Sequence, residues 1–126
     1  MEKEVPIGNL YEMNKTVMNK AAALKADEIE DKKNSLINFF IKNECRYYML
    51  LCNERKDYTV FHIQQKRIAE SETTAAFEVI ECLKERGEIL AIDYIEETGA
   101  YECWIRRSGL SYMYALFPYD AAVIEC

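Results

Sequence analysis

The sequence predicts an α+β domain: a long N-terminal helix and a central helix packed on an antiparallel sheet of about five strands. Three observations predict this class. Apolar residues recur at three- and four-residue spacing near the N-terminus and again in mid-chain. Two segments rich in aromatic and β-branched residues flank a polar connection. The stretch 87–118 holds two turn signals between alternating residues, which predicts three consecutive strands and the order α-β-β-α-β-β-β.

We expect the 126 residues to form one domain, with an N-terminal helical arm at 9–43 and the sheet and central helix at 45–126. The helical pattern begins at Leu10 and passes through a highly charged segment near Asp27. One continuous helix to about Lys42 and two helices that meet near Asp27 both fit this pattern. The apolar stripe is thin, so the arm needs the sheet or a second copy of the protein to lie against.

The next segment is predicted to be a β-hairpin. Its strands are 46–52 and 58–63, and the polar residues 53–57 connect them. Both strands are apolar on both faces, which is typical of strands that are covered on two sides or central in a sheet. Residues 65–70 are expected to be a connection.

A second helix is predicted between this hairpin and the last three strands. Ser71 or Thr73 can cap its N-terminus, and the helix is expected to run to about Arg86, with Gly87 as its stop. Four residues form its apolar side: Ala76, Val79, Ile80 and Leu83.

Two-residue turns at 98–99 and 108–109 would fix the register of the last three strands. With such turns, Tyr94 lies opposite Cys103. Alternate side chains then share a face, and one face is apolar enough to be the core. Its residues are Leu90, Ile92, Tyr94, Tyr101, Cys103, Ile105, Tyr112, Tyr114 and Leu116.

The opposite face mixes large apolar side chains with single charges. In the predicted register Asp93, Trp104 and Met113 align across the three strands, and Arg106 shares their face. An arginine, an aromatic ring and an acid can clamp a nucleotide, by contacting a phosphate, a base and a ribose hydroxyl. We therefore predict a ligand site at Asp93, Trp104, Arg106, Met113 and Phe117. The alternative is an oligomer or helix-packing face that buries Trp104 and Met113.

Charge and cysteine usage exclude several classes of protein. The net charge of −6 does not favour binding to a nucleic-acid polymer. The five cysteines are odd in number and lack C-x-x-C spacing, so we expect reduced thiols and no metal site. Since the sequence shows neither signal-peptide features nor a membrane-spanning run, we expect a cytoplasmic protein without membrane contact.

The sequence also lacks the patterns of an enzyme. It has no nucleophile-elbow motif and no phosphate-binding glycine loop. His62 is the one histidine, and no partner residue for a catalytic dyad is evident from the sequence. We therefore expect no catalysis, no catalytic residue and no cofactor. A small enzyme that uses His62 is the least favoured alternative.

The order of these elements resembles one family of small phage proteins that act against bacterial defence. The resemblance covers the N-terminal helix, the hairpin RYYMLLCNERKDYTVFHI, the central helix and the closing stretch CWIRRSGLSYMYALFPYDAAVIEC. In this pattern the chain is similar to the Thoeris anti-defence protein 1 family. The resemblance implies a non-enzymatic sponge for cyclic ADP-ribose variants, and for cyclic oligonucleotides in some members. It also implies a dimer or higher homo-oligomer with the helix from Leu10 as the dimer arm.

The sequence thus leads to one expected function and one alternative. The expected function is to sequester a cyclic nucleotide immune signal in the cytoplasm, that of the host cell if a phage encodes the protein. The alternative is a small acidic protein–protein inhibitor or adaptor that blocks a host defence factor. It would use the mixed face or the acidic helix surface at 28–31.

Overall fold

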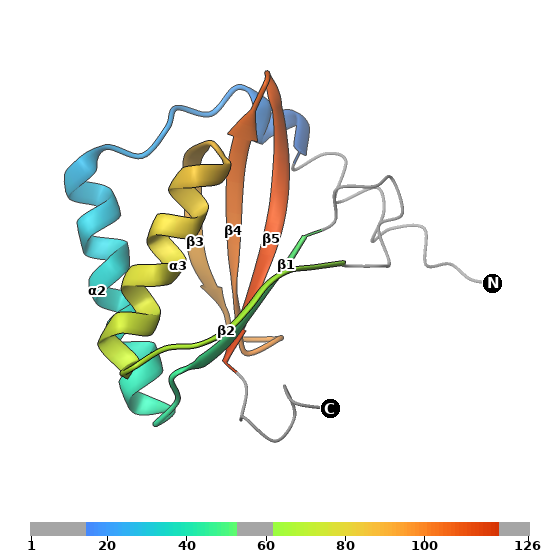
Figure 1. The fold of residues 1–126 in the computed structure, drawn as a ribbon. Coiled ribbons are helices and arrows are strands. Elements are labelled where there is room, and N and C mark those ends of the chain that lie inside the picture. The colour runs from blue at the N-terminus through green and yellow to red at the C-terminus, as the bar shows by residue number, and fades with distance from the viewer. Residues whose placement is uncertain (1–14, 53–61, 119–126) are drawn as a thin grey trace.

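The fold is an α+β arrangement, with the two long helices packed on one face of an antiparallel sheet (Figure 1). The computed structural model describes the backbone of residues 15–52 and 62–118, and the side chains of 15–52 and 67–118. The helices are α2 (Ala26–Lys42) and α3 (Glu72–Arg86), and residues 15–19 are also helical. The strands are β1 (Tyr47–Cys52), β2 (His62–Ile68), β3 (Glu88–Ile95), β4 (Ala100–Arg107) and β5 (Leu110–Pro118).

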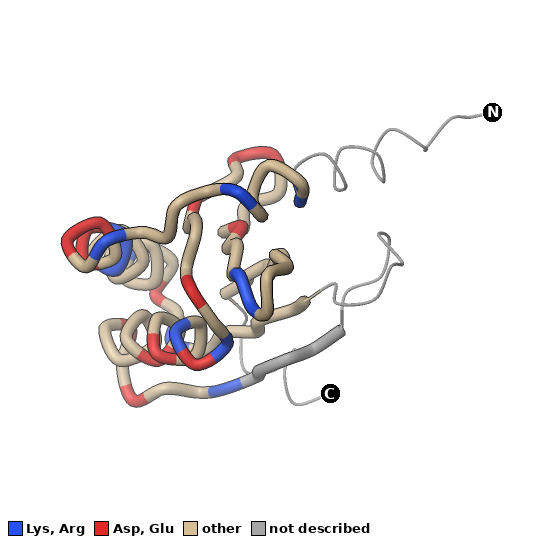
Figure 2. The backbone as a smooth tube through the Cα atoms, turned by 90° about the horizontal axis from the view of Figure 1, so that it is seen from above, with Lys and Arg blue, Asp and Glu red and all other residues tan. Residues whose placement is uncertain are grey.

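The strand order in space is β2-β1-β5-β4-β3, and every pair is antiparallel. The predicted class and the order of α2 to β5 along the chain are therefore confirmed. Seen from above, α2 and α3 lie together on one side of the sheet (Figure 2). Neither helix is long and apolar enough to cross a membrane, and this holds for every helix in the described residues.

Of the two alternatives for the N-terminal helical pattern, the one continuous helix is wrong for the part of 9–43 that the structure describes. The chain leaves the helix after Asn19 and is irregular until α2 begins at Ala26, whereas residues 9–14 lie outside the described part. The break agrees with the alternative of two helices that meet near Asp27. Its cause is local, because Lys25 adopts an extended backbone and its N–H donates to the Glu28 carboxylate at 2.9 Å, which caps a new helix.

Helix α2 is part of the core and packs against the rest of the domain. Leu36 and Phe40 are fully buried in one cluster with α3 and the sheet. In α3 the apolar side is as predicted: Ala76, Val79, Ile80 and Leu83 are all buried. Ser71 caps α3, since its Oγ accepts a hydrogen bond from the Thr74 N–H at 3.1 Å.

Gly87 ends α3 and leads directly into β3. Its φ is +153°, and a Cβ added there would lie 2.3 Å from the backbone oxygen of Arg106. The helical layer and strand β4 therefore meet at a point where only glycine fits without a shift of the backbone.

The two turns of the β3–β4–β5 meander differ from each other. Between β4 and β5 the turn has two residues, and Arg107 pairs with Leu110 as predicted. Between β3 and β4 the loop has four residues, because Gly99 at φ +70° closes a wider turn onto the Ile95 carbonyl. Tyr94 therefore pairs with Tyr101 and not with Cys103.

This shift of two residues preserves which face most side chains share, but a bulge next to Leu90 does not. Ile89 occupies the core in place of Leu90, which lies on the opposite face beside Trp104. The assignment of Leu90 to the core face is therefore wrong.

The β1–β2 hairpin also extends further than predicted. Residues 65–68 belong to β2 and are not a connection, and the part of the predicted strand at 58–61 lies outside the described residues. Strand β1 is central, between β2 and β5, whereas β2 pairs with β1 alone among the described strands and forms an edge of the sheet they make. An edge strand needs less apolar surface, which explains why the polar residues 64–67 can continue it.

Candidate functional site

The mixed face of the sheet is covered over β3–β5 by residues 15–24 of the same chain. Figure 1 shows this segment running from the start of α2 across one end of these strands. Leu24 fixes it at the β3 edge, where its N–H donates to the Ile89 carbonyl at 2.8 Å. We call residues 15–24 the strap.

Trp104 is the centre of a small second core under the strap. Its side chain is 3% exposed and packs with Leu90, Met18, Ala23 and Met113. Trp104 and Met113 are direct cross-strand neighbours, as predicted. The indole N–H donates to the Glu102 carboxylate at 3.1 Å. The ring is therefore enclosed in this structure and presents no open stacking surface.

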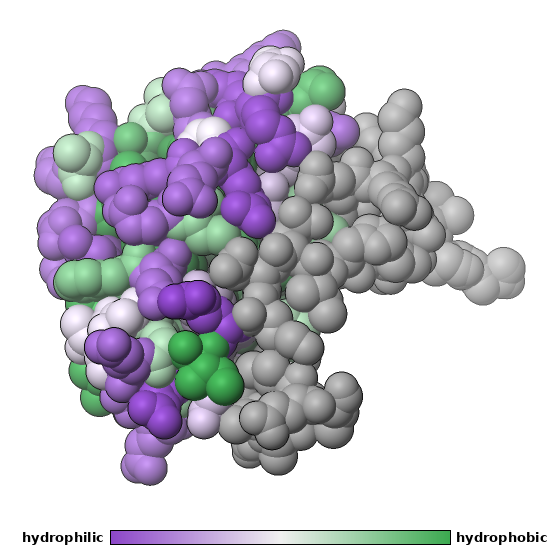
Figure 3. Space-filling view, viewed as in Figure 1, coloured by the Kyte–Doolittle hydropathy of each residue, from purple (hydrophilic) through white to green (hydrophobic). Residues whose placement is uncertain are grey.

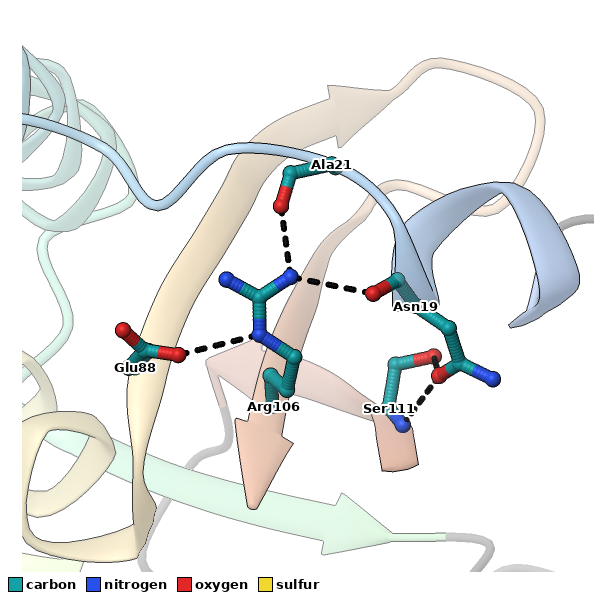
Figure 4. A network of polar contacts seen from close by, with 5 residues as sticks. All are labelled: Asn19, Ala21, Glu88, Arg106 and Ser111. Atoms are coloured by element: carbon teal, nitrogen blue, oxygen red, sulfur yellow. Dashed lines mark hydrogen bonds and ion pairs between the residues drawn. The ribbon is translucent and has the colours of Figure 1, made fainter. Parts of the chain in front are cut away.

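Arg106 holds the strap through its guanidinium group (Figure 4). Nη1 donates to the backbone oxygens of Asn19 at 3.1 Å and Ala21 at 2.6 Å. Nε donates to the carboxylate of Glu88, its cross-strand neighbour, at 2.9 Å. The last carbonyls of a helical segment carry partial negative charge, so an arginine is a favourable partner at this place.

Ser111 provides the second attachment of the strap. It is fully buried, and its N–H donates to Asn19 Oδ1 at 2.7 Å (Figure 4). Its hydroxyl lies 2.9 Å from the Lys15 carbonyl and 2.7 Å from Asn19 Oδ1, and its one proton can be donated to either. Since these groups would otherwise be buried without partners, the strap and the sheet depend on each other.

The structure does not bring Asp93 to the other predicted site residues. Asp93 pairs across the sheet with Glu102, and Ala91 takes the place opposite Trp104. Its carboxylate accepts from Lys32 Nζ of α2 at 3.1 Å. Glu102 and Arg106 are four positions apart on β4, which is about 13 Å along a strand. The four-residue loop before β4 causes this displacement.

Phe117 shares the mixed face but lies further along β5. It is half-buried opposite Met49 of β1 and four residues from Met113, again about 13 Å along the strand. The structure thus groups Trp104, Arg106 and Met113, and places Asp93 and Phe117 outside this group.

A hollow of about 300 Å³ between α3 and strands β1 and β2 is a feature that sequence reasoning missed. Its lining comprises Tyr48, Arg67, Phe77, Glu78, Glu81, Cys82 and Glu85. Glu78 links its two sides, since it accepts from Arg67 Nε at 2.8 Å and from the Tyr48 hydroxyl at 3.4 Å. The available signal was the spacing of Glu78, Glu81 and Glu85, which puts three carboxylates on neighbouring positions of one helix side.

Burial controls the titratable groups at the base of this hollow. It raises the pKa of the Tyr48 hydroxyl above its ordinary range, and the charge of Glu78 adds to this effect. It also raises the pKa of the Cys82 thiol. Both groups stay protonated at neutral pH, so neither Tyr48 nor Cys82 is an activated nucleophile, and the two supply hydrogen bonds beside the carboxylates. The side chain of His62 lies outside the described residues.

Comparison of the chain with protein-family models, with curated proteins and with solved structures finds no match.

Proposed function

We propose that this protein is a non-catalytic, phage-type immune-evasion protein that binds and sequesters a cyclic nucleotide signal in the host cytoplasm. The ligand class is a cyclic ADP-ribose variant or a cyclic oligonucleotide, by resemblance to the Thoeris anti-defence protein 1 family. One observation carries the proposal: one nitrogen of the Arg106 guanidinium donates to two oxygen acceptors. Arg106 lies two positions after Trp104 on β4, so the two side chains share a face. A phosphate group offers acceptors of the same kind with a full negative charge.

The strap would have to move for such a ligand to bind. Phosphate oxygens would replace the carbonyls of Asn19 and Ala21 on Arg106. Ala23 would leave its contact with Trp104, and the freed indole could then stack on a base. Because the ligand must outweigh the contacts it replaces, the proposal couples binding to displacement of residues 15–24.

Calorimetric titration with cyclic ADP-ribose isomers and cyclic oligonucleotides tests the proposal. Binding of at least one of them is expected, and Arg106→Gln should weaken it at least tenfold because it removes the cation. Arg107→Gln is the matched control, since Arg107 lies on the other face, 4.6 Å from the Tyr112 ring centroid. Its affinity should stay within twofold of the wild type.

Three results would contradict the proposal. The first is the absence of heat with every nucleotide while the protein is folded. The second is equal loss of affinity in both arginine variants. The third is recovery of altered nucleotide after heat denaturation of the complex, which would indicate an enzyme. Light scattering tests the associated expectation of a dimer or higher homo-oligomer, and a monomer at all concentrations would exclude it.

A protein–protein inhibitor is the second candidate, and one observation favours it. The mixed face is already occupied by the strap, whereas α2 presents Glu28, Glu30 and Asp31 to solvent. An acidic surface of this kind suits a basic host factor. Stoichiometric co-purification of one host protein, without nucleotide, would support this candidate over the first.

A further inference from the structure

We propose that the helical layer carries a docking site for a basic segment of another protein. The segment would place an apolar side chain in a groove between α2 and α3 and an arginine or lysine in the hollow on the other side of Phe77. This surface is distinct from the mixed face and its strap, so the inference does not depend on nucleotide binding.

The groove between the two helices has an apolar floor and a charged rim. Its volume is about 380 Å³, and the floor is formed by Ala26, Ile29, Phe77 and Ile80. The rim consists of two ion pairs, Lys33 with Glu30 at 3.0 Å and Lys84 with Glu81 at 3.5 Å. Because each rim charge is balanced by its neighbour, the groove itself favours an apolar side chain of moderate size.

Phe77 stands between this groove and the hollow, and it lines both. It is 45% exposed, although its helical neighbours Ala76 and Ile80 are buried in the core. Lys33 Nζ lies 4.6 Å from the centre of its ring. A large aromatic ring that is half exposed between two depressions is typical of a binding anchor. In Figure 3, hydrophobic side chains are visible among the hydrophilic ones over the two helices.

The hollow has the opposite electrostatic character from a phosphate site. Among the lining residues that the structure describes, Arg67 is the one cation, and the carboxylates are Glu78, Glu81 and Glu85. Arg67 and Tyr48 already engage Glu78, and Lys84 engages Glu81. The carboxylate of Glu85 makes no ion pair or hydrogen bond with the residues that the structure describes. A second cation entering the hollow would be stabilised by these carboxylates, whereas an anion would be repelled.

The same charges identify the occupant as a basic partner and not a second copy of this chain. Figure 2 shows acidic residues interspersed with basic ones along both helices. The protein has a net charge of −6, so a second copy would bring more carboxylates to Glu81 and Glu85. A positively charged polypeptide would be stabilised by long-range attraction to the net negative charge of the protein and by local pairing with the Glu85 carboxylate.

Nuclear magnetic resonance titration of the full chain can test the docking site. The probes are capped pentapeptides that each contain one leucine and one arginine, separated by one, two or three positions. We expect saturable shifts in the amide signals of Phe77, Glu81 and Glu85 with at least one spacing. Peptides in which glutamate replaces arginine, or serine replaces leucine, should bind at least fivefold more weakly.

Variants of the protein make the test specific. Phe77→Ala and Glu85→Lys should each weaken the best peptide at least tenfold, and both positions are exposed, so dispersed spectra should be retained. Glu97→Lys is the control for net charge, because it makes the same change in the exposed β3–β4 loop. Its affinity should remain within twofold of the wild type.

Several outcomes would overturn the inference. One is the absence of shifts with every peptide. Another is an equal effect of Glu85→Lys and Glu97→Lys, which would show general charge attraction only. A third is concentration-dependent shifts of Phe77 without peptide, which would assign the surface to a second copy. Saturable binding of a nucleotide at Glu81 and Glu85 would also contradict it.

Discussion

The two faces of the sheet are covered in different ways. The face under α2 and α3 is sealed by apolar side chains, among them Leu36, Phe40 and Leu83, which are fully buried. The opposite face is covered over β3–β5 by the strap, which Arg106 and Ser111 hold through hydrogen bonds. The helical cover is stabilised mainly by the apolar area that it removes from water. The strap depends on a few hydrogen bonds, whose strength depends on their direction.

This difference has a consequence for stability. A truncation under the helices leaves a cavity in the main core, and its cost falls on the whole domain. A change at Asn19 or Ser111 removes polar contacts of a ten-residue segment and can open that segment alone. Four substitutions can therefore test whether the two faces are as distinct as the contacts indicate.

The largest effect is expected for Phe40→Ala on the helical face. Phe40 is fully buried and packs edge-on against Phe39 and Tyr48. Removal of a buried phenyl ring costs about 3–5 kcal/mol of unfolding free energy, which urea titration followed by circular dichroism would measure. Ile41→Ala, at the neighbouring position that is 52% exposed, should change stability by less than about 0.5 kcal/mol. Equal effects at the two positions would contradict the assigned core.

The next largest effect is expected for Gly87→Ala, where the helical layer joins β3. The new Cβ would meet the Arg106 carbonyl at 2.3 Å in a backbone with φ +153°, so the strand must shift. Strain of this kind costs about 3 kcal/mol. Gly99→Ala is the control, since a Cβ there meets nothing within 4 Å and pays only for its φ of +70°, about 1–2 kcal/mol. Thermal or urea unfolding measures the loss of stability in each variant, and the ratio of the two losses tests the close approach of Gly87 to the Arg106 carbonyl. A larger loss for Gly99→Ala than for Gly87→Ala would refute that close approach.

Much of this fold follows from local patterns in the sequence. The cap at Ser71, the stop at Gly87 and the apolar side of α3 depend on residues within one helix, and the structure agrees with all of them. The two-residue turn between β4 and β5 is equally local, and Gly109 at φ +79° together with Ser108 at +55° forms it.

The failures of prediction concern the lengths of connections. The turn signal at 98–99 is compatible with two or four loop residues, and the structure has four. A difference of two residues leaves each side chain on its face but increases the offset between Asp93 and Arg106 along the strand from two residues to four, which is about 13 Å. The bulge beside Leu90 has no sequence marker such as glycine, and it becomes visible only in the pairing with β4.

The candidate site shows the same limit. The grouped residues all lie on β4 and β5: Trp104, Arg106 and Met113. The alternation of side chains along the strands and the two-residue turn at 108–109 were therefore enough to predict that they share a face. The strap that covers them comes from residues more than eighty positions earlier in the chain. No local pattern indicates that Asn19 and Ala21 reach Arg106, because this contact depends on the break before α2.

A smaller effect is expected for Asn19→Ala under the strap. The substitution removes the acceptor of the buried Ser111 N–H, which costs about 1–3 kcal/mol when no new partner replaces it. Opening of the strap should expose Trp104, the single tryptophan, and shift its fluorescence to longer wavelength. Hydrogen exchange should accelerate at 15–24 more than in α3.

Asn34→Ala provides the control, because Asn34 is exposed on α2, outside the strap. It should leave the fluorescence unchanged and alter stability by less than about 0.5 kcal/mol. If Asn19→Ala instead lowered the stability of the whole domain with no local exchange, the strap would be part of a single cooperative unit.

The smallest effect at neutral pH is expected for Tyr48→Phe, and it grows with pH. The ring stays in place, and the bond lost to Glu78 is long at 3.4 Å, so the cost at pH 7 is below about 1 kcal/mol. Burial raises the pKa of this hydroxyl in the folded state above the value of 10.0 of an exposed tyrosine. Above about pH 10 the unfolded chain releases this proton and the folded chain keeps it, so stability falls as pH rises.

Tyr48→Phe removes the hydroxyl group that ionises in the unfolded chain. The urea midpoint should therefore decline less steeply between pH 9 and 11 in this variant than in the wild type. Burial also raises the pKa of Tyr101 and of the Cys82 and Cys103 thiols, so the decline is reduced and not abolished. Glu78→Gln should reduce it less than Tyr48→Phe, because the charge of Glu78 is a smaller cause than burial. A decline as steep as in the wild type would show that Tyr48 ionises equally in both states, and that the helical face is wetter at β1 than its packing indicates.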